Sequence, residues 1–295
     1  MRIVSGIASA VAGIALAVLL LASGYFVCAA PPTTAMLASA TSTENAATAF
    51  THDDVVSVAC ATRDYSFGDH DIDALNRAIY DANVNAAARQ AAGALTVAAG
   101  APNLKGVAAD DAAAIQAAFA QATDVYVYPA DTISHLDDCY AIACAANVAV
   151  GVLAVVLVVC LIACGALVGR RRVGRVLQVA GIAVLALFVV CGIWAAIDFY
   201  GLFVVFHEVF FAQTGNWVFS ETSLLICALP EDFWMGMGAV WLATSAIASI
   251  LSILIGSALA RRPKAGARGN ASGNTRDNVR AATSAEPATD PSTTL

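Results

Sequence analysis

The sequence contains few charged residues for its length. Only 13% of its 295 residues are Asp, Glu, Lys or Arg, whereas 59% are hydrophobic and the mean hydropathy is +0.74. An average soluble domain carries about 25% charged residues. This shortage of charge argues against an ordinary soluble domain and for a chain that is largely embedded in a membrane.

Motifs of several well-known enzyme classes are also missing. The chain has no G-x-S-x-G elbow, no Walker phosphate loop and no H-E-x-x-H zinc motif. These absences weigh against a serine hydrolase of that type, an ATP-driven pump and a zinc protease. Histidine, a common acid or base in catalysis, occurs only at His52, His70, His135 and His207.

Four long hydrophobic runs are present, each long enough for a membrane-spanning helix of about 20 residues. The first run could be mistaken for a secretory signal peptide, but its apolar core is too long, so we expect a retained helix. Bulky Val27 stands before Cys28 where a lipoprotein-processing site has a small residue, so the chain is not expected to be a lipoprotein itself. Because no charged residue lies in the middle of a run, a transporter is disfavoured. The runs cover residues 3–28, 141–169, 173–197 and 234–260.

The charges that remain are distributed asymmetrically across these runs. Eleven of the fifteen basic residues lie on one side, and nineteen of the twenty-two acidic residues lie on the other. Short loops rich in Lys and Arg stay in the cytoplasm. We therefore predict a multi-pass protein of the plasma membrane with both termini cytoplasmic. Its acidic outer face argues against a nucleic-acid partner.

The cysteines do not form an obvious disulfide framework. Cys144, Cys160, Cys164 and Cys191 lie inside the predicted spans, where cysteine behaves as a small hydrophobic residue, and Cys28 is the last residue of the first span. On the outer side, a Cys60–Cys139 disulfide is conceivable, but spacing alone does not assign it.

The first outer segment, 29–134, is predicted to be a mostly helical extracytoplasmic cap. It opens with a Pro-, Thr- and Ser-rich stretch, 30–49, that is typical of a tether. Helical spacing follows in 71–91 and 110–122, and alternation in 124–131 favours a short strand. The segment has few large side chains, so we expect it to pack over the outer ends of the spans instead of folding alone.

The second outer segment, 198–233, is too apolar for a free loop and carries charges that resist burial in lipid. An interfacial or re-entrant element would reconcile these properties. The predicted fold is therefore an all-α membrane protein with four transmembrane helices, a cap and this interfacial segment. Its parts are 1–28 (first span), 29–134 (cap), 135–197 (second and third spans with a basic turn), 198–233 (interfacial segment), 234–260 (fourth span) and 261–295 (disordered cytoplasmic tail).

Two histidines lie where these parts meet. His135 precedes the second span and His207 follows the third, so the hairpin of these spans can bring both imidazoles to one pocket. Histidine suits proton transfer because its ordinary pKa is about 6.5. Asp138 or Glu208 could fix the tautomer of one ring. The alternatives are a helix-start cluster around His135, an interfacial His207, or a metal site, for which the spacings are weak.

Together, these segments resemble a known membrane enzyme family. "HLDDCYAI" and "FHEVFFAQTGNWVFSETSLLICALPEDFW" are similar to the H-x-x-D motif and the F-H-x-x-F-F … W-x-F … L-P-x-x-F-W run of the lipoprotein intramolecular transacylase (Lit) family. The family often has Asp in place of Ser220 and Val in place of Cys139. The positions that match are His135, Asp138, His207, Phe210, Phe211, Trp217, Phe219, Leu225, Leu229, Pro230, Phe233 and Trp234.

The resemblance implies acyl transfer within one diacylglyceryl-modified lipoprotein, from the sn-2 ester to the α-amine of its N-terminal cysteine, at the outer leaflet. Because donor and acceptor are tethered, no cofactor is implied. His207 would be the base or carry a transient acyl group, with His135 and Asp138 as a second proton-handling pair and Glu208 beside them. Substrate-binding side chains would be Asn216, Trp217, Phe210, Phe211 and Trp234, with Asn216 or Trp217 donating to the oxyanion.

Two other functions stay open at this point. A lipid or lipoprotein acyl hydrolase could use the same histidines with water, releasing free fatty acid. A non-catalytic receptor or scaffold would instead depend on the helices between Ile72 and Phe119.

Overall fold

The structure, a computed structural model, describes residues 2–93, 99–211 and 217–261. Within these ranges, all regular secondary structure is α-helical. The predicted disordered tail lies outside the described residues, apart from Arg261. Residues up to Ala260 form one compact unit, to which the following description refers.

Four helices are long and apolar enough to cross a membrane. The predicted spans correspond to α1 (Arg2–Cys28), α6 (Ala130–Val168), α7 (Arg170–Ile197) and α10 (Glu231–Ala260). The main difference is at α6, which begins at Ala130, before the predicted start at residue 141. Asp131 lies in the first turn of α6, where a negative charge stabilises the N-terminus of a helix. His135 consequently lies inside a continuous helix, on its second turn.

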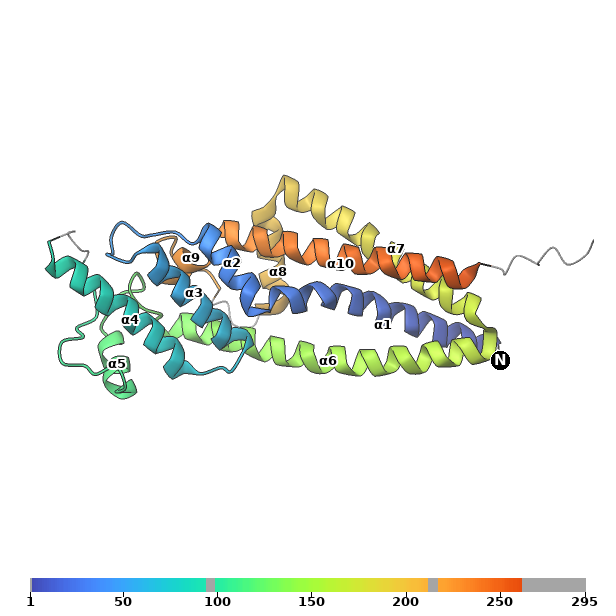
Figure 1. Ribbon diagram of the computed structural model, residues 1–295, viewed down its shortest axis with the longest axis horizontal. Helices are drawn as coiled ribbons and strands as arrows, with labels where there is room; N and C mark the ends of the chain where they lie inside the picture. The colour runs from blue at the N-terminus through green and yellow to red at the C-terminus, as the bar shows by residue number, and fades with distance from the viewer. Residues whose placement is uncertain (1, 94–98, 212–216, 262–295) are drawn as a thin grey trace, which may run out of the picture. The chain divides into compact units, whose positions relative to one another are not determined.

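Small residues allow α7 and α10 to pack closely. A Cβ on Gly174 would lie 2.5 Å from the carbonyl oxygen of Gly256, and a Cβ on Gly181 would lie 2.7 Å from that of Ser249. Such close contact between backbones is typical of membrane helices. On the other side of α10, the Trp241 indole N–H donates to the Leu21 carbonyl of α1 at 2.8 Å. Figure 1 shows α1 running beside both α6 and α10.

The cap contains the helices α2 (Pro31–Thr41), α3 (His52–Phe67), α4 (Ile72–Ala91) and α5 (Ala112–Phe119). The last two were predicted, and Asp71 and Asp111 cap their N-termini. The predicted tether was wrong, because α2 occupies much of it. Pro31 suits the first turn of a helix, and α2 buries one face against α3.

The cap buries more large side chains than its composition indicates. Its core includes Leu75, Ile79 and Tyr126, and it is completed by the short helix α9 (Leu224–Ala228) from the second outer segment. The Leu224 N–H donates to the Asp124 carbonyl at 2.8 Å, which ties the two segments together. The cap and the residues around α9 therefore share one core.

The predicted strand at 124–131 was also wrong. Residues 124–127 form turns, and α6 begins at Ala130. Alternation failed as a signal because Tyr126, Val127 and Tyr128 are all buried, so no face of this segment is exposed. The Tyr128 hydroxyl lies 2.8 Å from that of Thr62 in α3, and both side chains are buried.

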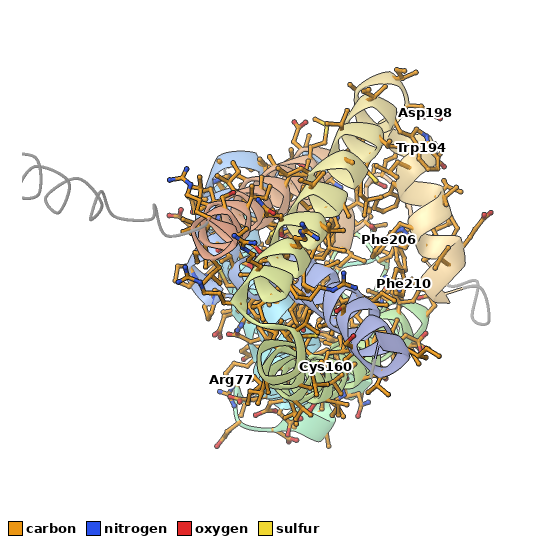
Figure 2. All side chains as sticks on the ribbon, turned by 90° about the vertical axis from the view of Figure 1, so that its right-hand side faces the viewer. Arg77, Cys160, Trp194, Asp198, Phe206 and Phe210 are labelled. Carbon is orange, nitrogen blue, oxygen red and sulfur yellow. The ribbon has the colours of Figure 1, made fainter. Side chains whose placement is uncertain are left out.

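After α7, the chain folds back on itself in a helical hairpin. Asp198 ends α7, and its carboxylate accepts from the Gly201 N–H at 2.8 Å, which starts α8 (Phe199–Phe211). Figure 2 shows α8 returning beside α7 from Asp198, with Phe206 and Phe210 farther along it. This return brings the end of α8 to the start of α6.

Candidate active site

His207 is held on α8 by a hydrogen bond from one of its two ring nitrogens, and the other nitrogen forms none with the described residues. Its side chain is 8% exposed, and Nδ1 lies 2.8 Å from the carbonyl oxygen of Phe203, one helical turn earlier. A carbonyl only accepts, so Nδ1 carries the proton and Nε2 keeps its lone pair. Burial lowers the pKa of His207, and the hydrogen bond to Phe203 offsets this only in part. The imidazole is therefore a neutral base at neutral pH.

His135 faces His207 from α6. The centroids of the two rings are 6.1 Å apart, their planes are 26° from parallel, and His135 is 7% exposed. The Cys139 sulfur lies 3.7 Å from Nε2, and with the thiol as the donor the proton of the neutral ring is on Nδ1. Among the described residues, Nδ1 is buried and has no hydrogen-bond partner. The two histidines thus present different groups: a free acceptor on His207 and a free donor on His135.

Aromatic rings enclose the pair. Phe211 contacts both histidines, with its centroid 4.8 Å from that of His135 and 5.4 Å from that of His207. The other rings are Phe203 (4.0 Å from His207), Phe206 (5.4 Å from His207), Trp217 (5.0 Å from His207) and Phe219 (5.5 Å from His135). This enclosure provides the low-dielectric surroundings in which a neutral histidine is stable.

The family comparison agrees with this geometry. The model of the family described as lipoprotein intramolecular transacylase Lit matches residues 115–234, a range that contains both histidines and every ring around them. This region of the chain, 120 of its 295 residues, is similar to the Lit family. None of the curated proteins compared with the sequence matches it.

A solved structure has a similar fold. It is that of the membrane integral lipoprotein intramolecular transacylase Lit from Bacillus cereus, which is 15% identical, with a TM-score of 0.54. The match covers 88% of this chain and 97% of that chain. At this identity the likeness concerns the fold, and it identifies the four apolar helices as those of an integral membrane protein.

The two carboxylates predicted to assist the histidines, Asp138 and Glu208, are placed differently from expectation. No hydrogen bond joins Asp138 to His135, and Asp138 Oδ2 is buried without a partner among the described residues. Glu208 is exposed, because it follows His207 by one position and points to another side of α8. The Phe203 carbonyl, not Glu208, fixes the tautomer of His207.

The predicted substrate-binding residues separate into two groups. Phe211 and Trp217 contact His207. Phe210 is 50% exposed and packs on Phe206, 4.8 Å away, instead of on the histidines. Trp234 donates its indole N–H to the Leu229 carbonyl at 3.1 Å. Asn216 lies outside the described residues.

Three site residues were not singled out from the sequence. Phe203 precedes His207 by four positions, so helical spacing would have placed its carbonyl beside the ring. The same spacing relates Cys139 to His135. Phe219 belongs to the family motif, but no local pattern indicates that the chain brings it to His135.

The remaining histidines and cysteines lie elsewhere. His70 stacks between Tyr65 and Tyr140, with ring centroids 4.3 Å and 3.9 Å away. All eight cysteines are free, so Cys60 and Cys139 are not joined. Across the described ranges, no group of three or more His, Cys, Asp or Glu side chains is placed to hold a metal ion.

Proposed function

We propose that this protein moves the sn-2 acyl chain of a diacylglyceryl-cysteine lipoprotein to the α-amine of that cysteine. The observation that carries the proposal is the buried pair of histidines, 6.1 Å apart, with one free acceptor and one free donor. The reaction needs both groups, because an amine must lose a proton while a carbonyl oxygen gains negative charge.

In the proposed reaction, the amine nitrogen attacks the carbonyl carbon of the sn-2 ester and gives its proton to His207 Nε2. The tetrahedral oxyanion accepts a hydrogen bond from His135 Nδ1–H, and Trp217, beside His207, is a second candidate donor. The bond from the carbonyl carbon to the glycerol oxygen then breaks. That oxygen takes the proton back from His207, which leaves an amide and a free hydroxyl.

Two features support transfer to an amine over transfer to water. The aromatic rings around the histidines make the site apolar, which disfavours the entry of water. The acceptor amine belongs to the same molecule as the ester, so its effective concentration is high. The free Nε2 of His207 also permits a transient acyl-histidine, the other role left open by the sequence.

The proposed orientation in the membrane follows from the distribution of charge. With eleven of fifteen basic residues in cytoplasmic segments, both termini are cytoplasmic and the histidines face outward. His135 lies six residues before the predicted apolar start of the second span, or about 9 Å along the helix. This depth suits an ester at the boundary between acyl chains and headgroups.

The experiment is mass spectrometry of the N-terminal peptide of a reporter lipoprotein, from cells with this protein, with His207→Phe, or with neither. Phe keeps an aromatic ring among Phe203, Phe211 and Trp217 but removes both nitrogens. The expected result is an N-acyl, lyso-form peptide only with the unaltered protein. Full transfer by His207→Phe would refute the role of His207, and free fatty acid with no N-acyl peptide would favour the hydrolase.

A further inference from the structure

Asp138 has no partner that explains its position. It follows His135 by three positions, on the same face of α6, and its Oδ2 atom is buried. It does not orient His135, because His135 Nδ1 is equally without a hydrogen-bond partner in the part of the chain that the structure describes. Two buried atoms on one face of α6, an acceptor oxygen and a ring nitrogen, are therefore left without a hydrogen-bond partner among the described residues.

A cationic hydrogen-bond donor would stabilise the buried carboxylate oxygen of Asp138. A buried carboxylate oxygen with no hydrogen bond is strongly destabilising, so native proteins pair such groups or use them for a ligand. The cationic side chains of the cap that form ion pairs are used elsewhere: Arg63 contacts Asp64 and the Ala29 carbonyl, and Arg89 contacts Asp54. Within the described ranges, no ion pair involves Asp138.

We propose that Asp138 binds the α-ammonium group of the substrate's N-terminal cysteine. This inference rests on the proposed function, in which that amine is the acyl acceptor. The amine has an ordinary pKa of about 8 and is mostly protonated at pH 7, so it reaches the site as a cation. The two unsatisfied groups then match the two reacting groups, with Asp138 accepting from the ammonium and His135 donating to the ester carbonyl.

The pairing also gives the reaction a direction. Before the attack the ammonium releases one proton to bulk water, and transfer then converts the neutral amine into an amide, which carries no charge. Asp138 therefore binds the substrate better than the product, and the product loses this interaction as it forms. A lipoprotein that is already N-acylated lacks the ammonium as well, so Asp138 selects chains with a free amine.

The test measures binding of two unreactive analogues, separately from the reaction. Both are short peptides with a dialkylglyceryl cysteine, in which ether linkages replace the esters; one has a free α-amine and the other is N-acetylated. Their dissociation constants are measured at pH 7 for the unaltered protein, Asp138→Asn and Asp137→Asn. The Asn substitution keeps the shape of the side chain and removes its charge. Asp137, the neighbouring control, contacts Tyr65 and His70 instead of His135 and His207.

The unaltered protein and Asp137→Asn are expected to bind the free amine about 10-fold more tightly than the acetylated analogue. In Asp138→Asn this preference should fall to about 2-fold or less, with binding of the acetylated analogue unchanged. A preference retained in Asp138→Asn, or none in the unaltered protein, overturns the inference. Because the analogues cannot react, failure of the proposed function appears separately, as the absence of N-acyl product from the ester substrate.

Discussion

Two adjacent phenylalanines on α8 offer a matched test of the site. Phe211 is 7% exposed and its ring contacts both histidines, whereas Phe210 is 50% exposed and packs on Phe206. The substitutions Phe211→Leu and Phe210→Leu make the same chemical change on the same helix. Only the first is expected to disturb the histidines.

The magnitude follows from the contacts that are lost. An aromatic pair contributes about 0.5–1.5 kcal/mol beyond its buried area, so the two contacts of Phe211 with the histidines amount to about 1–3 kcal/mol. If this energy holds the rings in their reactive geometry, its loss slows the reaction about 5- to 150-fold, since about 1.4 kcal/mol corresponds to tenfold. Phe210→Leu removes no contact with a histidine, so we expect a change of less than about twofold.

The assay uses protein in lipid vesicles and a synthetic diacylglyceryl peptide, with kcat and KM determined by mass spectrometry of the N-acyl product. The loss in Phe211→Leu should lie mainly in kcat, because the histidines act on the transition state. Thermal unfolding of both variants controls for loss of the folded protein. Equal losses of activity in the two variants, or a fully active Phe211→Leu, would refute the claim that Phe211 supports activity by holding the two histidine rings.

Three further predictions concern pH and packing. Because burial lowers the pKa of His207, the enzyme base in the pH profile of kcat/KM should titrate below about 6.5, separately from the substrate amine, whose ordinary pKa is about 8; an enzyme pKa at or above about 6.5 would contradict a buried base. Burial raises the pKa of Asp54, but hydrogen bonds, first that from the Thr51 N–H, and a guanidinium on α4 lower it overall. The stability that the Asp54 carboxylate contributes is therefore present above about pH 4 and is lost as the pH falls through its lowered pKa. Asp54→Asn should lower the free energy of unfolding by about 1–3 kcal/mol, measured with denaturant. The variant should then lose less stability in acid than the unaltered protein does. Gly181→Ala should lower the thermal midpoint by several degrees, since its Cβ would meet the backbone of α10 at 2.7 Å, whereas Gly192→Ala, with no atom within 4 Å, should not.

Hydrophobicity predicted the membrane helices well because a span needs only length and apolar composition. It did not predict where α6 begins, because residues 130–140 are polar enough to resemble a loop. The tether was wrong for a related reason: its Ala, Ser and Thr residues have weak helical signals, and the burial of Thr34 and Ala38 that stabilises α2 depends on the rest of the cap.

At the site, connectivity was the informative part of the sequence. The hairpin of two spans was sufficient to predict that His135 and His207 meet. It could not determine the state of either ring, because that depends on which atoms lie within hydrogen-bond distance. The Phe203 carbonyl replaced Glu208 as the partner of His207, and Cys139 replaced Asp138 beside His135. A charged neighbour in sequence is a poor guide when backbone and thiol groups compete for the same nitrogen.

The continuity of α6 has a mechanical consequence. One unbroken helix runs from the predicted cytoplasmic turn at Gly169 to His135, a length of about 50 Å. A continuous helix of this length fixes the distance between the reacting groups and the cytoplasmic surface. A thicker or thinner bilayer changes the tilt of α6 and shifts the ester carbonyls of the lipid relative to His135. The thickness of the membrane is then itself a determinant of which lipids align with the histidines.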